Sequence, residues 1–104
     1  MAHIVVLMTA GRSEEAATIA RALVNERLAA CVNLLPGITS CYRWEGRVAE
    51  DAEILLVAKT RTELFEALAR RVRELHSYAT PEIIAVPVVA GSPDYLQWID
   101  RETG

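Results

Sequence analysis

Apolar runs alternate with segments of helical periodicity in the first third of the chain. Residues 4–8, IVVLM, are continuously apolar and mostly β-branched, which is typical of a strand buried on both faces. A turn at residues 11–12 follows, and Ser13 is a candidate N-cap for a helix that should run to about residue 28. The pattern therefore predicts a strand followed by a helix.

The middle of the chain predicts a long hairpin. Residues 30–35 and 38–44 form one predicted strand, which the Pro-Gly pair at residues 36–37 kinks or bulges. A Glu-Gly pair at residues 45–46 is typical of a hairpin turn, and the next predicted strand covers residues 52–60.

The last part of the chain predicts a helix, a strand and a short helix. Thr62 is a candidate cap for the first of these helices, whose apolar positions follow helical spacing: Leu64, Leu68, Val72 and Leu75. Residues 83–89 form the predicted strand, in which Pro87 favours an edge position or a strand end. Ser92 and Pro93 fit the cap and the first turn of the final helix.

The element order indicates an α+β fold of the ferredoxin-like type, a βαββαβ sandwich with a C-terminal helix. Two helices cover only one face of a four-stranded sheet, yet several strands are apolar almost throughout. A second copy of the sheet is the simplest cover for the other face, so the strand pattern predicts a homo-oligomer. The hairpin at residues 42–48 carries Tyr42 and Trp44, which we expect to be interface anchors on an arm that reaches a neighbouring subunit.

The composition agrees with one folded domain spanning residues 1–104, since 52% of the residues are hydrophobic and 24% are charged. The net charge is −3, and the only basic cluster, at residues 70–73, fits a solvated helix face, so we expect no nucleic-acid partner. No apolar run approaches the roughly 20 residues of a membrane helix, and no signal peptide is evident. We therefore expect a cytoplasmic protein with no membrane partner.

The two cysteines are predicted to be free thiols. Cys31 and Cys41 fall in one predicted strand, where extended geometry places them far beyond the Cα separation of about 7 Å that a disulfide allows. No functional role is assigned to Cys41.

Residues 76–84, HSYATPEII, carry the candidate chemistry. Pro81 stiffens this connector, so the His76 imidazole and the Glu82 carboxylate are expected near one another. Together with Cys31, which we expect to approach through the sheet, they would suit Cu(II) or Zn(II). Two alternatives stay open: His76 is a structural residue at a helix C-terminus, and Cys31 is a buried, inert thiol.

A second candidate site would take an anion. Lys59 closes an apolar strand and could form a pocket for an anionic small molecule at a subunit interface with His76, Tyr78 and Glu82. In the simpler alternative, Lys59 and Glu82 form a structural ion pair. No nucleophile-elbow, phosphate-loop or metalloprotease motif is present, so we expect no enzyme.

Five blocks of the sequence resemble the CutA divalent-cation tolerance family. In order, they are LAACVN at 28–33, SCYRWEG at 40–46, KT at 59–60, the segment 76–84 and YLQWI at 95–99. The resemblance implies a ferredoxin-like homotrimer with its sheets packed around a three-fold axis. It also implies a cytoplasmic protein associated with tolerance to copper and other divalent metals, and structural kinship with the trimeric PII signalling proteins, which bind small ligands between subunits.

We therefore expect weak binding of Cu(II) or another divalent metal in clefts between subunits, with no metal required for folding. The alternative is a PII-like sensor or signalling adaptor with an anionic ligand in the same clefts. Some bacterial members of the family carry a Cys at the end of the first strand and a second His before the motif His, and both are implicated as copper ligands. This chain has Met8 and Leu75 at those positions, which leaves His76 and the soft thioether of Met8.

Overall fold

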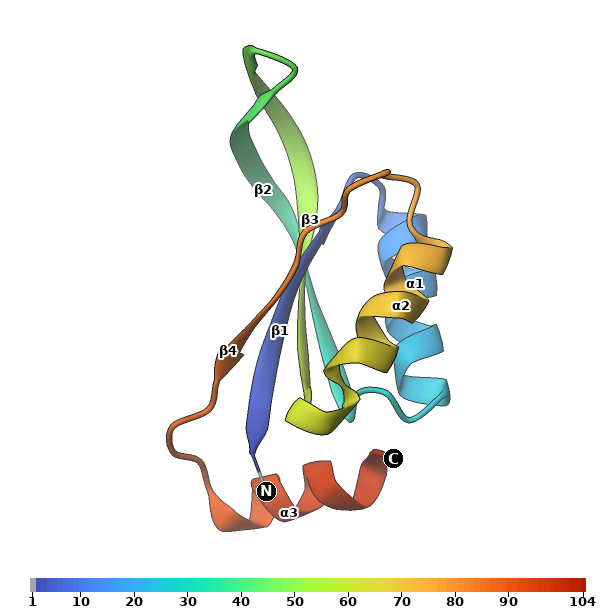
Figure 1. The fold of residues 1–104 in the computed structure, drawn as a ribbon, viewed down its shortest axis with the longest axis vertical. Helices are drawn as coiled ribbons and strands as arrows, with labels where there is room; N and C mark the ends of the chain where they lie inside the picture. The colour runs from blue at the N-terminus through green and yellow to red at the C-terminus, as the bar shows by residue number, and fades with distance from the viewer. Residues whose placement is uncertain (1) are drawn as a thin grey trace.

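The computed structural model describes residues 2–104, and they follow the predicted order of elements (Figure 1). The elements are β1 (His3–Ala10), α1 (Ser13–Asn25), β2 (Cys31–Trp44), β3 (Arg47–Arg61), a 3₁₀ turn (Thr62–Leu64), α2 (Phe65–Leu75), β4 (Ile83–Pro87) and α3 (Pro93–Glu102). The strands form one sheet in the order β2-β3-β1-β4, and every neighbouring pair is antiparallel. This arrangement confirms the ferredoxin-like α+β prediction.

The helices form a layer on one face of the sheet and a cap at one end. α1 and α2 lie together against the sheet, while α3 lies beyond the end at which β1 begins (Figure 1). The β1 side chains that face the helix layer are buried: Ile4, Val6, Met8 and Ala10. They pack in one core with Ile19, Leu23, Leu56, Leu68 and Val72. The apolar positions that recur every 3.6 residues in the helices therefore pack against those that alternate along the strands, in a single core.

The helix ends differ from the prediction in three places. Ser13 is the first residue of α1 and Arg12 holds the N-cap position, without a side-chain cap hydrogen bond. α1 ends at Asn25, because Arg27 takes a positive φ of 61° that the helix cannot contain. Thr62 opens the 3₁₀ turn and does not cap α2. The N-caps predicted at Ser13 and Thr62 are therefore wrong.

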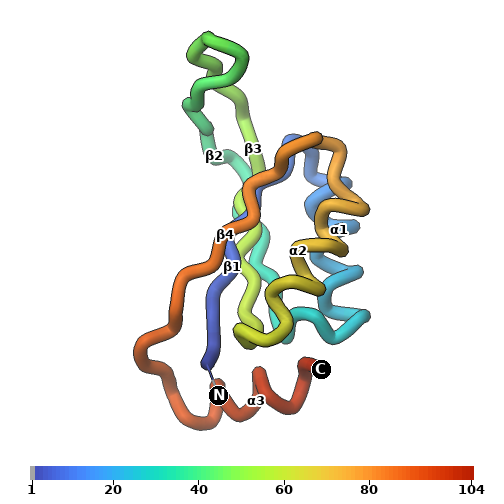
Figure 2. Tube along the Cα trace, viewed as in Figure 1, coloured from blue at the N-terminus to red at the C-terminus, as the bar shows by residue number. Residues whose placement is uncertain are grey.

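β2 and β3 form a hairpin that extends past the rest of the sheet (Figures 1 and 2). Their pairing shifts register between Leu35 and Ile38, which confirms the bulge predicted at the Pro-Gly pair. At the tip, Glu45 and Gly46 both take positive φ, 51° and 78°, as a tight hairpin turn requires. β3 begins at Arg47, so the arm is paired almost to its tip.

The sheet face turned away from α1 and α2, called the open face below, is mostly apolar, although Thr9, Asn33 and Lys59 also lie on it. Strand register places the following apolar residues on it: Val5, Leu7, Leu35, Leu55, Val57, Ile84 and Val86. Leu35, Ile84 and Val86 are 47%, 52% and 43% exposed. Within one chain, Val5 and Leu7 of β1 are only half-buried on the open face, while Thr9 is buried. Full burial of β1 on both faces stays a prediction for the oligomer. β4 lies at the sheet edge, as Pro87 predicted.

Cys31 and Cys41 are free thiols, which confirms the prediction. Cys31 is half-buried and Cys41 is exposed.

Among residues 2–104, no helix combines the length and the apolarity that crossing a membrane requires.

Candidate functional site

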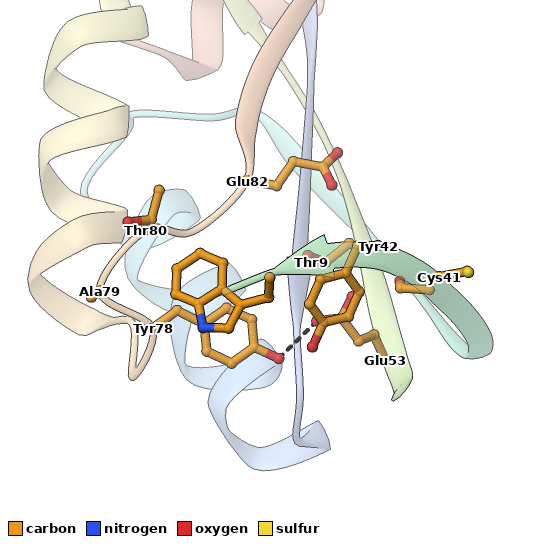
Figure 3. Close-up of a pocket in the computed structure, with 10 residues that line it drawn as sticks. Thr9, Cys41, Tyr42, Glu53, Tyr78, Ala79, Thr80 and Glu82 are labelled. Carbon is orange, nitrogen blue, oxygen red and sulfur yellow. Dashed lines mark hydrogen bonds between the residues drawn. The ribbon is translucent and has the colours of Figure 1, made fainter. Parts of the chain in front are cut away.

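A cavity of about 550 Å³ lies where the β2–β3 arm leaves the sheet. The hairpin supplies Ser40, Cys41, Tyr42 and Trp44, and the segment between α2 and β4 supplies Tyr78, Ala79, Thr80 and Glu82. Thr9 and Glu53 complete the lining. Figure 3 shows Tyr42, Glu53 and Tyr78 grouped together, with Glu82 on the segment that leads into β4. Segments distant in sequence thus meet around one hollow.

Glu53 is the buried acid of the cavity. It is 7% exposed, and its Oε2 accepts a hydrogen bond of 2.7 Å from the Tyr78 hydroxyl (Figure 3). That bond, followed by partial burial and the nearby negative charge, raises the pKa of Tyr78 to about 12. At neutral pH, Tyr78 is therefore a neutral donor to a carboxylate.

Gly11 allows this contact. A Cβ atom at Gly11 would lie 2.9 Å from the Tyr78 hydroxyl oxygen, closer than real Cβ contacts come. The connector after α2 can therefore carry Tyr78 past the end of β1 and onto Glu53. A second tyrosine repeats the pairing at the surface: the Tyr42 hydroxyl donates to Asp51, and this bond raises the pKa of Tyr42.

His76 lies outside the cavity lining, and both of its ring nitrogens are engaged. The Tyr78 backbone N–H donates to Nδ1 at 3.0 Å, so Nε2 carries the proton and donates to the Thr9 carbonyl at 2.7 Å. The imidazole side chain is 0% exposed, and the His76 backbone N–H caps α2 by bonding to the Val72 carbonyl. This geometry favours the structural alternative for His76.

The carboxylate beside His76 is Glu15, not Glu82. Glu15 Oε2 lies 3.3 Å from His76 Nδ1 and accepts a hydrogen bond from the Ser77 hydroxyl. The expected closeness of His76 and Glu82 is therefore wrong: Glu82 lines the cavity, whereas the His76 ring is held by the Thr9 carbonyl and the Tyr78 backbone N–H. Within residues 2–104, no group of three or more His, Cys, Asp and Glu side chains is placed to hold a metal ion.

Cys31 and Lys59 lie far from His76 along the direction of the strands. They are cross-strand partners, and Lys59 also pairs with Val5 of β1, whereas His76 bonds to Thr9. Val5 and Thr9 are four residues apart on β1, which at about 3.3 Å per residue is a separation of about 13 Å. The expectation that Cys31 approaches His76 is therefore wrong within one chain.

The contacts of Cys31 and Lys59 agree with this placement. Cys31 lies beside Tyr95 of α3, whose pKa is raised by partial burial first and then by the thiol. The Lys59 ammonium donates to the Asn33 side-chain oxygen. The predicted Lys59–Glu82 ion pair does not form within residues 2–104, because the Lys59 ammonium bonds to Asn33. The anion pocket is expected at a subunit interface and stays a prediction.

Four residues singled out from the sequence do meet in the cavity: Tyr42, Trp44, Tyr78 and Glu82. Sequence reasoning missed Glu53, the buried acid between them. One signal in the sequence could have indicated it. Glu53 directly precedes the apolar run 54–58, and a charged residue next to a buried strand is unusual unless its side chain has a partner.

The family profile described as CutA1 divalent ion tolerance protein matches residues 4–102. The chain belongs to the CutA1 divalent ion tolerance family. It is 55% identical over 100 residues to the divalent-cation tolerance protein CutA of Thermus thermophilus, covering 96% of this chain and 97% of the relative. It is 47% identical to a chloroplastic CutA protein of Arabidopsis thaliana, covering 96% of this chain and 55% of that longer relative.

Solved structures of CutA1 family members have the same fold. The Thermus thermophilus protein superposes with a TM-score of 0.96 at 54% identity, over 98% of this chain and 99% of that one. CutA1 from Oryza sativa superposes with a TM-score of 0.97 at 44% identity, over 100% of this chain and 95% of that one. The architecture that forms the cavity is therefore that of the family.

The two family positions discussed for copper do not form a site in this CutA1 chain. Met8 is 1% exposed and packs in the helix-facing core, so its thioether is closed to a metal ion. Leu75 is partly buried against the same core. The Met8 thioether therefore offers no contact to a copper ion within one chain, because strand alternation turns its side chain into the helix-facing core.

The Tyr78–Glu53 bond predicts an alkaline loss of stability. The folded-state pKa of Tyr78, about 12, exceeds the ordinary value of 10.0, so folding favours the neutral hydroxyl. This stabilisation is present in full below pH 10 and is lost as the pH rises from 10 through about 12. Urea unfolding across this range should show Tyr78→Phe to be less stable than wild type below pH 10, with the difference shrinking above it. A constant difference would contradict the assigned bond.

Proposed function

We propose that this CutA1-family protein acts in divalent-cation tolerance as a non-catalytic homotrimer that binds divalent metal weakly in the cavity. The observation that carries the proposal is the charge of the lining: Glu53 and Glu82 contribute carboxylates, and of the described residues no Lys, Arg or His lines the cavity. Two carboxylates attract a cation, but they supply fewer protein ligands than a tight site uses. Weak binding follows.

The open face supports the oligomer in this proposal. Leu35, Ile84 and Val86 are exposed on it in the single chain, and another copy of the same sheet is a cover with matching chemistry. Glu53 and Leu55 are two residues apart on β3, so their side chains project to the same side of the sheet. The cavity therefore borders the open face, and a neighbouring subunit would stand beside it.

The anionic ligand of the PII-like alternative finds no support in this cavity. Lys59 is engaged with Asn33 elsewhere, and an anion would meet Glu53 and Glu82 without a compensating cation from the lining. We therefore place cation binding ahead of anion binding at this site.

Calorimetric titration of the metal-stripped protein with Cu(II) and Zn(II), with light scattering on the same sample, tests the proposal. We expect a trimeric mass and a dissociation constant of about 10⁻⁵ to 10⁻⁴ M, which Glu82→Gln weakens and the exposed α2 variant Glu66→Gln leaves unchanged. A monomeric mass would overturn the assembly. Metal binding that is non-saturating, or indifferent to Glu82, would overturn the site.

A further inference from the structure

We propose that the preferred occupant of the cavity is a small organic cation, an alkylammonium group held by Glu53 and Glu82 and enclosed by aromatic rings. This inference rests on the proposed function in that it uses the same cavity. It names a ligand class that the divalent-cation role does not include.

The buried carboxylate has an oxygen left for a ligand. Glu53 uses Oε2 for the Tyr78 hydroxyl, and its Oε1 makes no hydrogen bond within residues 2–104. In that part of the chain, no buried side-chain oxygen or nitrogen lacks a hydrogen-bond partner, so Oε1 must be reachable from the cavity that Glu53 lines. A carboxylate oxygen in a 93% buried residue would gain most from a charged donor.

The rings around this acid suit an organic cation. Tyr42, Trp44 and Tyr78 all line the cavity, and the face of such a ring attracts an ammonium or alkylammonium group. Both tyrosine hydroxyls are already committed, to Asp51 and to Glu53, so these residues offer ring surface more than hydrogen bonds. A hydrated metal dication gains little from aromatic surface, whereas the methylene groups beside an ammonium nitrogen pack against it.

The volume and the charge of the cavity agree with this ligand class. About 550 Å³ falls in the range of pockets that hold small organic ligands, and it far exceeds what a bare ion needs. Glu82 is exposed and Glu53 is buried, so the two acidic side chains of the lining lie at different depths of the cavity. An amine that enters meets negative charge both at the mouth and at the buried end.

Calorimetric titration of the trimer with 1,4-diaminobutane tests the proposal, with butyrate and 1-butanol as the anionic and neutral probes of similar size. We expect saturable binding of the diamine and no binding of the other two probes. Glu82→Gln and Glu53→Gln should each weaken diamine binding at least about tenfold, because each removes one charge-assisted contact while retaining size and a hydrogen-bond acceptor. Glu66→Gln on α2 is the matched control and should bind as wild type does.

Trp44→Leu separates ring contact from charge. It should weaken the diamine several-fold and leave Zn(II) binding unchanged, because only the organic cation uses the ring. Trp44 is also an expected interface anchor, so light scattering must show that Trp44→Leu is still trimeric before it is titrated. Glu82 is exposed, so Glu82→Gln keeps the test valid even if Glu53→Gln does not fold.

The two proposals for the cavity can fail separately. No diamine binding up to about 10 mM, equal binding of butyrate, or an equal loss in Glu66→Gln would overturn the ligand class. Diamine binding without metal binding would support this inference and overturn the metal part of the proposed function. Metal binding without diamine binding would do the reverse.

Discussion

Replacing His76 by alanine is expected to lower the free energy of unfolding by about 2–4 kcal/mol, with or without metal present. The substitution would leave the Thr9 carbonyl and the Tyr78 backbone N–H without their partner and would open a void beside Glu15. Tyr78 would also lose the bond that holds its backbone N–H, and its ring lies over Gly11 and reaches Glu53, so the effect should spread to the cavity. Urea unfolding in chelator and in Cu(II) measures both conditions.

His76→Gln is the informative companion to this variant. A glutamine amide can donate to the Thr9 carbonyl as Nε2 does, so it should recover part of the stability that alanine loses. A His76→Ala protein that is fully stable in chelator but no longer binds Cu(II) would show His76 to be a metal ligand. That outcome would require the buried ring to leave both of its present partners.

Ile84→Glu is expected to dissociate the assembly and to raise the concentration at which half of it is monomeric at least about a hundredfold. Ile84 is 52% exposed in the single chain and lies on the open face opposite Leu7. A glutamate there is well solvated in the monomer, but in the assembly it would be a buried charge without a partner. Sedimentation velocity over a dilution series measures the shift.

Val24→Glu is the matched control for this experiment. Val24 is 42% exposed, but it lies on α1, in the layer that covers the opposite face of the sheet. It should leave the oligomeric mass unchanged. If Val24→Glu dissociates the protein and Ile84→Glu does not, the interface is on the helix layer and the role assigned to the open face is wrong.

The sequence by itself determined the element order and the bulge in β2, because these follow from local signals. Apolar periodicity, the Pro-Gly pair before Ile38 and the turn at Glu45 each act within a few residues, so each could be interpreted without knowing its neighbours in space. Four members of the cavity lining also stood out: Tyr42, Trp44, Tyr78 and Glu82. Tyr, Trp and Glu side chains are common in binding sites at protein surfaces, so these four could be selected by residue type alone.

Only the tertiary structure decided which chemical groups meet. Strand register placed Cys31 and Lys59 about 13 Å from the level of His76, and no local pattern in an apolar strand encodes register. The fold gave His76 two backbone-group partners, which turned a candidate ligand into a structural residue. It also buried Glu53 against Tyr78 through the space left at Gly11, a contact between three separate segments. A site assembled from long-range contacts of this kind has no signature in any one segment of the chain.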